Sequence, residues 1–156
     1  MEAEEKSVKI LTKYFSDVLD EIVVETLWAE VVDEEKGWYK VDNIPFYGAE
    51  FSCGDVVLAE YDEAEMCLVY RKVVEHSGNS TVQVVIFEDG FDIESLREEF
   101  NELGFSSEKV GSSYFVLEIP FDKNYNIIYT KLLALQDKGL LEFAESVLSE
   151  KHFKEK

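Results

Sequence analysis

Proline and glycine are scarce in this chain. Its 156 residues include two Pro and eight Gly, which leaves little room for a flexible linker. Hydrophobic residues make up 46% of the chain and aromatic residues 13%, which is enough for a real core and excludes wholesale disorder. The length fits one ordinary domain or two small ones.

Basic residues are also few. The chain has 15 Lys and Arg against 34 Asp and Glu, a formal net charge of −19. Up to His76 there are 19 acidic and 7 basic residues, and the rest holds 15 and 8, so the excess is spread along the chain. Because nucleic acid and anionic membranes are bound through Lys and Arg that displace counterions, we expect neither as a partner. A basic protein is a better candidate, although the same acidity also keeps a protein in solution.

Long apolar runs and signal patterns are absent as well. No run approaches the length of a bilayer span, and the first residues, MEAEEKSVKIL, lack a secretory pattern. Cys53 and Cys67 are isolated in strand-like contexts, which predicts buried reduced thiols. These features predict a cytoplasmic protein, and they set aside glycosylation at Asn79, whose N-x-S/T pattern requires secretion.

Metal ligands of the Cys and His type are too dispersed to form a site. Cys53, Cys67, His76 and His152 show no C-x-x-C or H-x-x-x-H spacing. The acidic stretches DEEKG and DEAE lack the graded spacing of an EF-hand loop. We expect no metal and no cofactor.

Residues 1–76 read as a β-rich part. Residues 8–15 are apolar-rich, residues 23–33 alternate, and WYKVDNIPF, VVLAEY and MCLVYRKVVEH follow as strands, with turns at EEKG and DEAE. Five or six short strands at this spacing predict a small β-barrel or a strongly bent sheet.

In residues 77–156 the spacing of apolar residues changes, and helical patterns alternate with strand patterns. After the strand TVQVVIFE, Asp92 is a predicted helix N-cap, and an apolar face follows at Ile93, Leu96, Phe100 and Leu103. FSSEKVGSSYFVLEIP predicts a hairpin and NYNIIYTKLLALQDKG a second helix, whereas LLEFAESVL fits a strand and a helix almost equally. The order β-α-β-β-α-β predicts a ferredoxin-like part, with two helices on one face of an antiparallel sheet. The expected fold class is therefore α+β.

The stretch SGNST joins the two parts. A phosphate cradle needs a following helix and a nearby Lys, whereas a strand follows here. A nucleophile would pair Ser77 or Ser80 with His76, but adjacent strand residues point to opposite faces, and no third group orients the base. We interpret the stretch as a tight turn in which Gly78 and Asn79 adopt positive φ and the hydroxyls satisfy backbone groups. The loop of interest comprises Asp55, Ser77, Gly78, Asn79, Ser80 and Thr81.

Carboxylates beside apolar strand residues could serve acid–base chemistry. Glu25, Glu30, Asp55 and Glu60 have such neighbours. In a chain with 34 acidic residues some of these juxtapositions arise by chance, so we interpret them as a solvated acidic face and predict no catalytic residue.

An aromatic pair stands next to an acidic turn. Trp38 and Tyr39 are adjacent on a predicted strand, so one of them should face outward. An exposed aromatic side chain ringed by carboxylates could anchor a basic partner. The candidate interface comprises Asp33, Glu34, Glu35, Trp38, Tyr39, Asp62, Glu63 and Glu65.

Four segments, ETLWAEVV, YKVDNIPFYG, GDVVLAEYD and VVEHSGNSTVQVV, together resemble a bacterial family of uncharacterised proteins, domain of unknown function 4265, over about residues 23–148. The residues that match the family pattern are Trp28, Asn43, Pro45, Phe46, Gly54, Asp55, Ser77, Gly78, Ser80 and Thr81. Members often carry His where this chain has Asn79, which implies that an imidazole there is dispensable. The family has no established activity, so the resemblance supports the architecture and leaves function open.

The sequence therefore predicts a non-enzymatic, acidic interaction protein, in its concrete form an immunity-type inhibitor of a basic toxin such as a nuclease domain. The alternative is a small-molecule-binding or regulatory module of unknown ligand. An enzyme is the third reading, which a pocket holding Ser80, His76 and a carboxylate would favour. The identity of the partner and the oligomeric state stay open.

Overall fold

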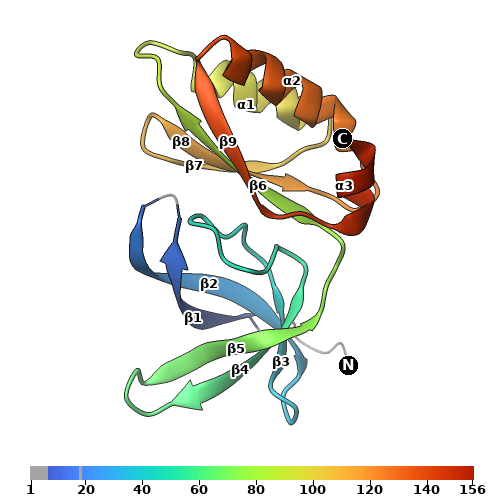
Figure 1. Ribbon diagram of the computed structural model, residues 1–156. Coiled ribbons are helices and arrows are strands. Elements are labelled where there is room, and N and C mark those ends of the chain that lie inside the picture. Colours follow the sequence, from blue (N-terminus) through green and yellow to red (C-terminus); the bar gives the residue numbers. More distant parts are fainter. Residues whose placement is uncertain (1–6, 18) are drawn as a thin grey trace. The chain divides into compact units, whose positions relative to one another are not determined.

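The computed structural model describes residues 7–17 and 19–156, which form nine strands and three helices (Figure 1). The fold is mixed α+β and dominated by two sheets, as the sequence predicts. The chain divides into two compact units, Met1–Ser77 and Gly78–Lys156, with the boundary inside the SGNST stretch.

The first unit is a five-stranded sheet. Its strands are β1 (Ser7–Ser16), β2 (Glu21–Asp33), β3 (Trp38–Val41), β4 (Val56–Asp62) and β5 (Cys67–Glu75). Each strand pairs antiparallel with the next. β1 also pairs in parallel with β5, through Ile10 with Leu68 and Leu11 with Val69, so the pairing returns to its first strand.

The alternation expected along β2 is present and shows which face is inside. Leu27 and Ala29 are buried and pack in the core of the unit, whereas Val24 and Trp28 are exposed. Glu25 has the same inward register as Leu27 and is also buried. The interpretation of Glu25 as part of a solvated face is therefore wrong, because strand geometry turns this side chain inward.

The second unit is a four-stranded antiparallel sheet with three helices. In chain order its elements are β6 (Ser80–Ile86), α1 (Ile93–Glu102), β7 (Ser107–Val110), β8 (Tyr114–Ile119), α2 (Asn126–Asp137), β9 (Leu141–Val147) and α3 (Glu150–Glu155). The strand order is β7-β8-β6-β9. Alternate residues of β6 and β8 pack against α1 and α2 in one core, so both helices cover the same face (Figure 1).

Local signals explain most helix and strand boundaries in this unit. The carboxylate of Asp92 accepts a hydrogen bond from the backbone N of Ser95 at 3.0 Å, which is the expected N-cap. The predicted apolar face is one residue too long, because Leu103 lies at the C-cap and is 46% exposed. The ambiguous segment LLEFAESVL is mainly a strand, since β9 pairs with β6 along its length. The short helix α3, capped by Ser149, was not expected.

Cys53 and Cys67 carry free thiols, as expected, but both are only half-buried. Within residues 7–17 and 19–156, no helix has the length and apolarity needed to span a bilayer. In the same residues, no three His, Cys, Asp or Glu side chains are grouped so as to hold a metal ion.

Candidate functional site

The two acidic turns of the first unit lie at the same end of its sheet. β2 and β4 both run antiparallel to β3, so the β2–β3 turn and the β4–β5 turn lie at one end. We call this the acidic end, and it comprises Asp33, Glu34, Glu35, Asp62, Glu63 and Glu65. The six acidic residues of the predicted interface are thus at one end of the unit.

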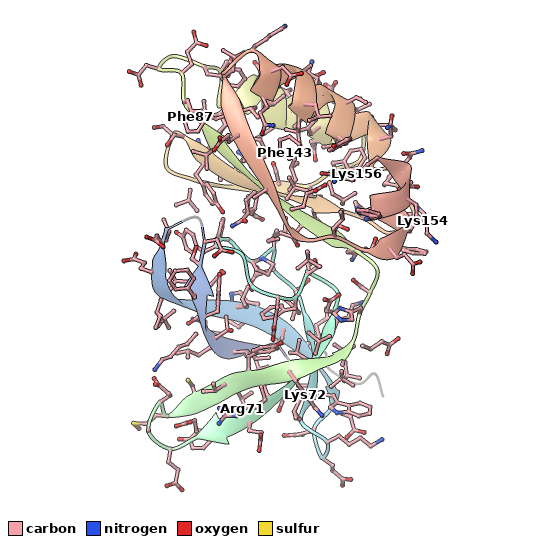
Figure 2. All side chains as sticks on the ribbon, viewed as in Figure 1. Arg71, Lys72, Phe87, Phe143, Lys154 and Lys156 are labelled. Carbon is pink, nitrogen blue, oxygen red and sulfur yellow. The ribbon has the colours of Figure 1, made fainter. Side chains whose placement is uncertain are left out.

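Three of these six carboxylates already form hydrogen bonds or ion pairs with other residues of this chain. Asp33 accepts from the backbone N of Lys36 at 3.1 Å. Asp62 accepts from the backbone N of Glu65, which is the main cause of its lowered pKa, and also pairs with Arg71 at 3.4 Å. Figure 2 shows Arg71 on β5 beside Lys72. These side chains stabilise the turns and offer less charge to a partner.

The other carboxylates are available. Glu34, Glu35 and Glu63 are exposed, and none of them has an ion-pair partner within the described part of the chain. Glu65 is exposed but is bound by Lys13, with 2.5 Å between Nζ and Oε1. The acidic end therefore presents three unneutralised carboxylates to solvent.

The aromatic pair beside the β2–β3 turn divides between surface and core. Trp38 is half-buried, with Lys36 Nζ 4.5 Å from its ring centroid. Tyr39 is only 6% exposed and packs in the core, and burial raises its pKa. Adjacent strand residues face opposite ways, so inclusion of Tyr39 in the interface is corrected and Trp38 is the aromatic residue that a partner could reach.

The opposite end of the sheet carries part of the family pattern, namely Asn43, Pro45, Phe46, Gly54 and Asp55. Here β3 and β4 are joined by residues 42–55, which we call the long loop. Asp55 is fully buried at the end of this loop. Its Oδ1 accepts from the backbone N of Ser77 at 2.8 Å and from the Ser77 hydroxyl at 2.7 Å, and its Oδ2 accepts from the backbone N of Ser52 at 2.9 Å. Asp55 therefore links the end of the long loop to Ser77, the last residue of the first unit, through hydrogen bonds.

His76 and Ser77 do not form a nucleophile and base. His76 Nδ1 lies 3.4 Å from Asp55 Oδ2 and its side chain is largely exposed. Ser77 donates to Asp55 instead. The interpretation of Asp55 as part of a solvated face is wrong, because its carboxylate satisfies buried backbone donors.

Glu25 holds the middle of the long loop. Both of its carboxylate oxygens lie 2.9 Å from the backbone N of Phe46, and the Tyr14 hydroxyl lies 3.4 Å from Oε1. Tyr14 in turn accepts from the backbone N of Tyr47 at 3.2 Å. Burial raises the pKa of Glu25, and the hydrogen bond from Phe46 opposes this shift. In the sequence, the only indication of this contact between Glu25 and the long loop is that Glu25 shares the inward-facing register of β2 with Leu27.

The rest of the SGNST stretch belongs to the second unit. Gly78 has φ +89°, as expected. Asn79 does not have positive φ, which corrects the prediction for this residue. Its side chain forms hydrogen bonds to two other segments of the unit. Its Oδ1 accepts from the backbone N of Phe121 at 2.9 Å, and its Nδ2 donates to Glu118 at 3.3 Å.

Ser80 pairs with His152, a residue that sequence reasoning did not connect to it. Ser80 Oγ lies 2.6 Å from His152 Nδ1, and Nε2 lies 3.0 Å from the Pro120 carbonyl oxygen. A carbonyl only accepts, so Nε2 carries the hydrogen and Nδ1 accepts from Ser80. Both side chains are fully buried, so a substrate cannot reach the pair. Thr81, the next residue, is buried in β6.

Comparison with known proteins agrees with this architecture. A crystal structure of a hypothetical protein from Neisseria gonorrhoeae is similar to this chain, with a TM-score of 0.77 over 94% of this chain and 99% of that one. The sequences are 21% identical, a level at which the likeness shows the fold alone. A search of curated proteins gave no match. The chain matches the domain of unknown function DUF4265 over residues 25–143. This match confirms the resemblance seen in the sequence, and the chain belongs to the DUF4265 family.

Proposed function

We propose that this chain is a non-enzymatic, cytoplasmic interaction protein that binds a basic protein through its acidic end. The concrete form that we favour is an immunity-type inhibitor of a basic toxin such as a nuclease domain. The observation that carries the proposal is the presence of Glu34, Glu35 and Glu63 at one end of the first unit, exposed and without ion-pair partners in the described chain.

The electrostatics of the acidic end support this reading. Three like charges at one end repel one another, and a basic partner would relieve that repulsion while being steered toward the site. Trp38 stands at the foot of the β2–β3 turn, where it could provide the apolar contact that a charged rim alone lacks.

We infer that the architecture is a small β-barrel followed by a ferredoxin-like unit. The return of the pairing from β5 to β1 supports the first part. The element order β6-α1-β7-β8-α2-β9 and the strand order β7-β8-β6-β9 support the second.

Capture from the native source followed by a binding measurement tests the functional proposal. We expect wild-type protein to retain a basic protein, and the joint change Glu34→Gln and Glu35→Gln to weaken that binding roughly tenfold, with an affinity that falls as salt rises. The matched control is Glu98→Gln with Glu102→Gln, two exposed acids on α1 that likewise form no ion pair in the described residues. The proposal fails if no basic protein is retained, if binding ignores salt, or if both double variants weaken it equally.

A second candidate function is small-molecule binding. A cavity of about 320 Å³ in the first unit, lined by part of β1, part of the long loop and Tyr70, favours it. A ligand that binds the folded state raises the melting temperature through linkage, so a thermal-shift screen of metabolites tests this candidate.

A further inference from the structure

The cavity lies where the pairing between β1 and β5 ends. In the described chain these strands pair only at Ile10 with Leu68 and Leu11 with Val69. Residues 12–15 of β1, residues 48–51 of the long loop and Tyr70 of β5 line the opening beyond those pairs. At about 320 Å³ it is at the small end of the range for ligand sites, and the end of a closed sheet is a common place for one.

Four aromatic residues contribute to the lining. Tyr14 and Phe15 come from β1, Phe51 from the long loop and Tyr70 from β5. The Phe51 and Tyr70 ring centroids are 4.7 Å apart. Phe51 is only 1% exposed and packs in the core of the unit, so Tyr70 is the more accessible ring of this pair. Phe15 is 55% exposed although it is large and apolar. Aromatic faces carry negative potential and attract cations.

One carboxylate completes the lining. Glu50 is exposed at the cavity, and its Oε1 accepts a hydrogen bond from the Tyr70 hydroxyl. Burial, together with the Glu50 charge, holds the pKa of Tyr70 well above its ordinary value. Tyr70 therefore stays a neutral donor and fixes the orientation of the carboxylate.

The remaining charge in the lining is already neutralised. Lys13 contributes to the cavity, but its ammonium is bound to Glu65 at 2.5 Å. An anionic ligand would face Glu50 and a chain with net charge −19. A neutral apolar ligand would gain nothing from the carboxylate, whereas a cation gains from both the rings and Glu50.

We propose that this cavity binds a small organic ammonium ion, with the rings of Phe15 and Tyr70 around the cation and Glu50 as its counter-ion. This site is separate from the surface proposed above for the basic partner, because none of the exposed carboxylates Glu34, Glu35 and Glu63 lines it. The two are joined through Lys13, which lines the cavity and binds Glu65 of the acidic end.

Choline and its uncharged isostere 3,3-dimethyl-1-butanol provide a matched pair of probes, titrated into the whole chain by NMR. We expect saturable shifts for choline at cavity residues, and at least tenfold weaker binding of the alcohol, which has the same shape but lacks the charge. Absence of choline binding at millimolar concentrations, or equal binding of both probes, would overturn the proposal.

Two variants and a control locate the site. Glu50→Gln and Phe15→Leu should each weaken choline binding about fivefold or more, as expected for loss of a counter-ion or of one cation–π face. Glu98→Gln removes one exposed acid on α1, which forms no ion pair in the described residues, and should change binding less than about twofold. Equal loss in Glu50→Gln and Glu98→Gln would mean bulk attraction and refute the site. Phe15 is largely exposed, so its variant should stay folded and keeps the test valid if Glu50→Gln does not fold.

Discussion

The hydroxyl of Ser80 donates to His152 Nδ1 across 2.6 Å and ties the last helix of the chain to the first strand of its unit. The Pro120 carbonyl accepts from Nε2 at 3.0 Å, so the neutral imidazole has partners on both sides. Burial is the main reason that the pKa of His152 is lowered, and the carbonyl partially opposes this shift. The pair is therefore a buried structural contact that depends on protonation.

Acidification should weaken the second unit through His152. The unfolded chain protonates this residue near its ordinary pKa of about 6.5, whereas the folded chain resists protonation until a lower pH. Because the unfolded state then binds more protons, stability falls as pH drops below about 6.5. Urea unfolding followed by NMR signals of β6 should show that the advantage of wild type over His152→Gln shrinks from about pH 8 to pH 5.5.

A matched variant separates the effect of the Ser80–His152 hydrogen bond from the effect of His152 protonation. Ser80→Ala keeps the imidazole, so it should cost about 1–2 kcal/mol at neutral pH and leave the pH slope largely in place. Parallel pH curves for wild type and His152→Gln would contradict the assignment of the slope to this residue.

Replacement of Asp55 should be among the most damaging polar changes in the first unit. Its buried carboxylate accepts from two groups of Ser77 and from the backbone N of Ser52. In Asp55→Asn one acceptor becomes an amide NH₂ that faces donors, and we expect a loss of about 2–4 kcal/mol in the free energy of unfolding. Ser77→Ala removes only one hydroxyl donor and should cost about 1 kcal/mol. A smaller loss for Asp55→Asn than for Ser77→Ala, measured by urea denaturation, would refute this account.

Local features were predictable from the sequence because their causes are local. The Asp92 cap depends on residues within one turn of the helix, and the alternation along β2 follows from strand geometry. The positions of the acidic turns were visible as clusters between strand patterns. That both turns lie at one end follows from the order of pairing, which the sequence alone did not provide.

Long-range partners were not predictable. His152 is 72 residues from Ser80, and no periodicity links them, so the nearer His76 was considered instead. Glu25 and Asp55 were taken for surface acids because acidic residues are abundant. Their backbone donors come from the long loop and, for Asp55, also from Ser77, and these segments have no regular structure. The cavity likewise combines β1, the long loop and β5, which only the fold brings together.

The contact between Glu25 and the long loop should change stability with pH in the opposite direction to His152. Burial raises the pKa of Glu25, so between its ordinary value near 4.5 and the raised value the folded state binds more protons. The contribution of Glu25 to stability therefore falls as pH rises through this window. Glu25→Gln should remove that dependence. The free energy of unfolding of wild type, relative to that of the variant, should therefore fall as pH rises above about 4.5.

A second Glu25 variant tests the role of the acceptor itself. Glu25→Ala leaves the backbone N of Phe46 without these two oxygens, and we expect a loss of about 2 kcal/mol at any pH in this range. Urea denaturation of the three proteins at several pH values provides the comparison. Identical pH slopes for wild type and Glu25→Gln would refute the raised pKa.

Gly78 should be required for two separable reasons. Its φ of +89° is unfavourable for any residue with a side chain, and an added Cβ would lie 2.5 Å from Cδ2 of Phe121. Gly90 has a similar φ of +82° but nothing within 4 Å of an added Cβ, so Gly90→Ala reports the backbone strain alone. We expect Gly90→Ala to cost about 1 kcal/mol and Gly78→Ala about 1 kcal/mol more, in the free energy of unfolding.

A double-mutant cycle tests whether the Phe121 ring causes the additional cost of Gly78→Ala. In a Phe121→Ala background the ring is gone, so Gly78→Ala should cost no more than Gly90→Ala does in wild type. Other contacts of the ring, such as that with Lys151 Nζ 5.4 Å from its centroid, are removed in both members of the comparison and cancel. If Gly78→Ala keeps its full excess cost without the ring, the clash with Phe121 is not its cause.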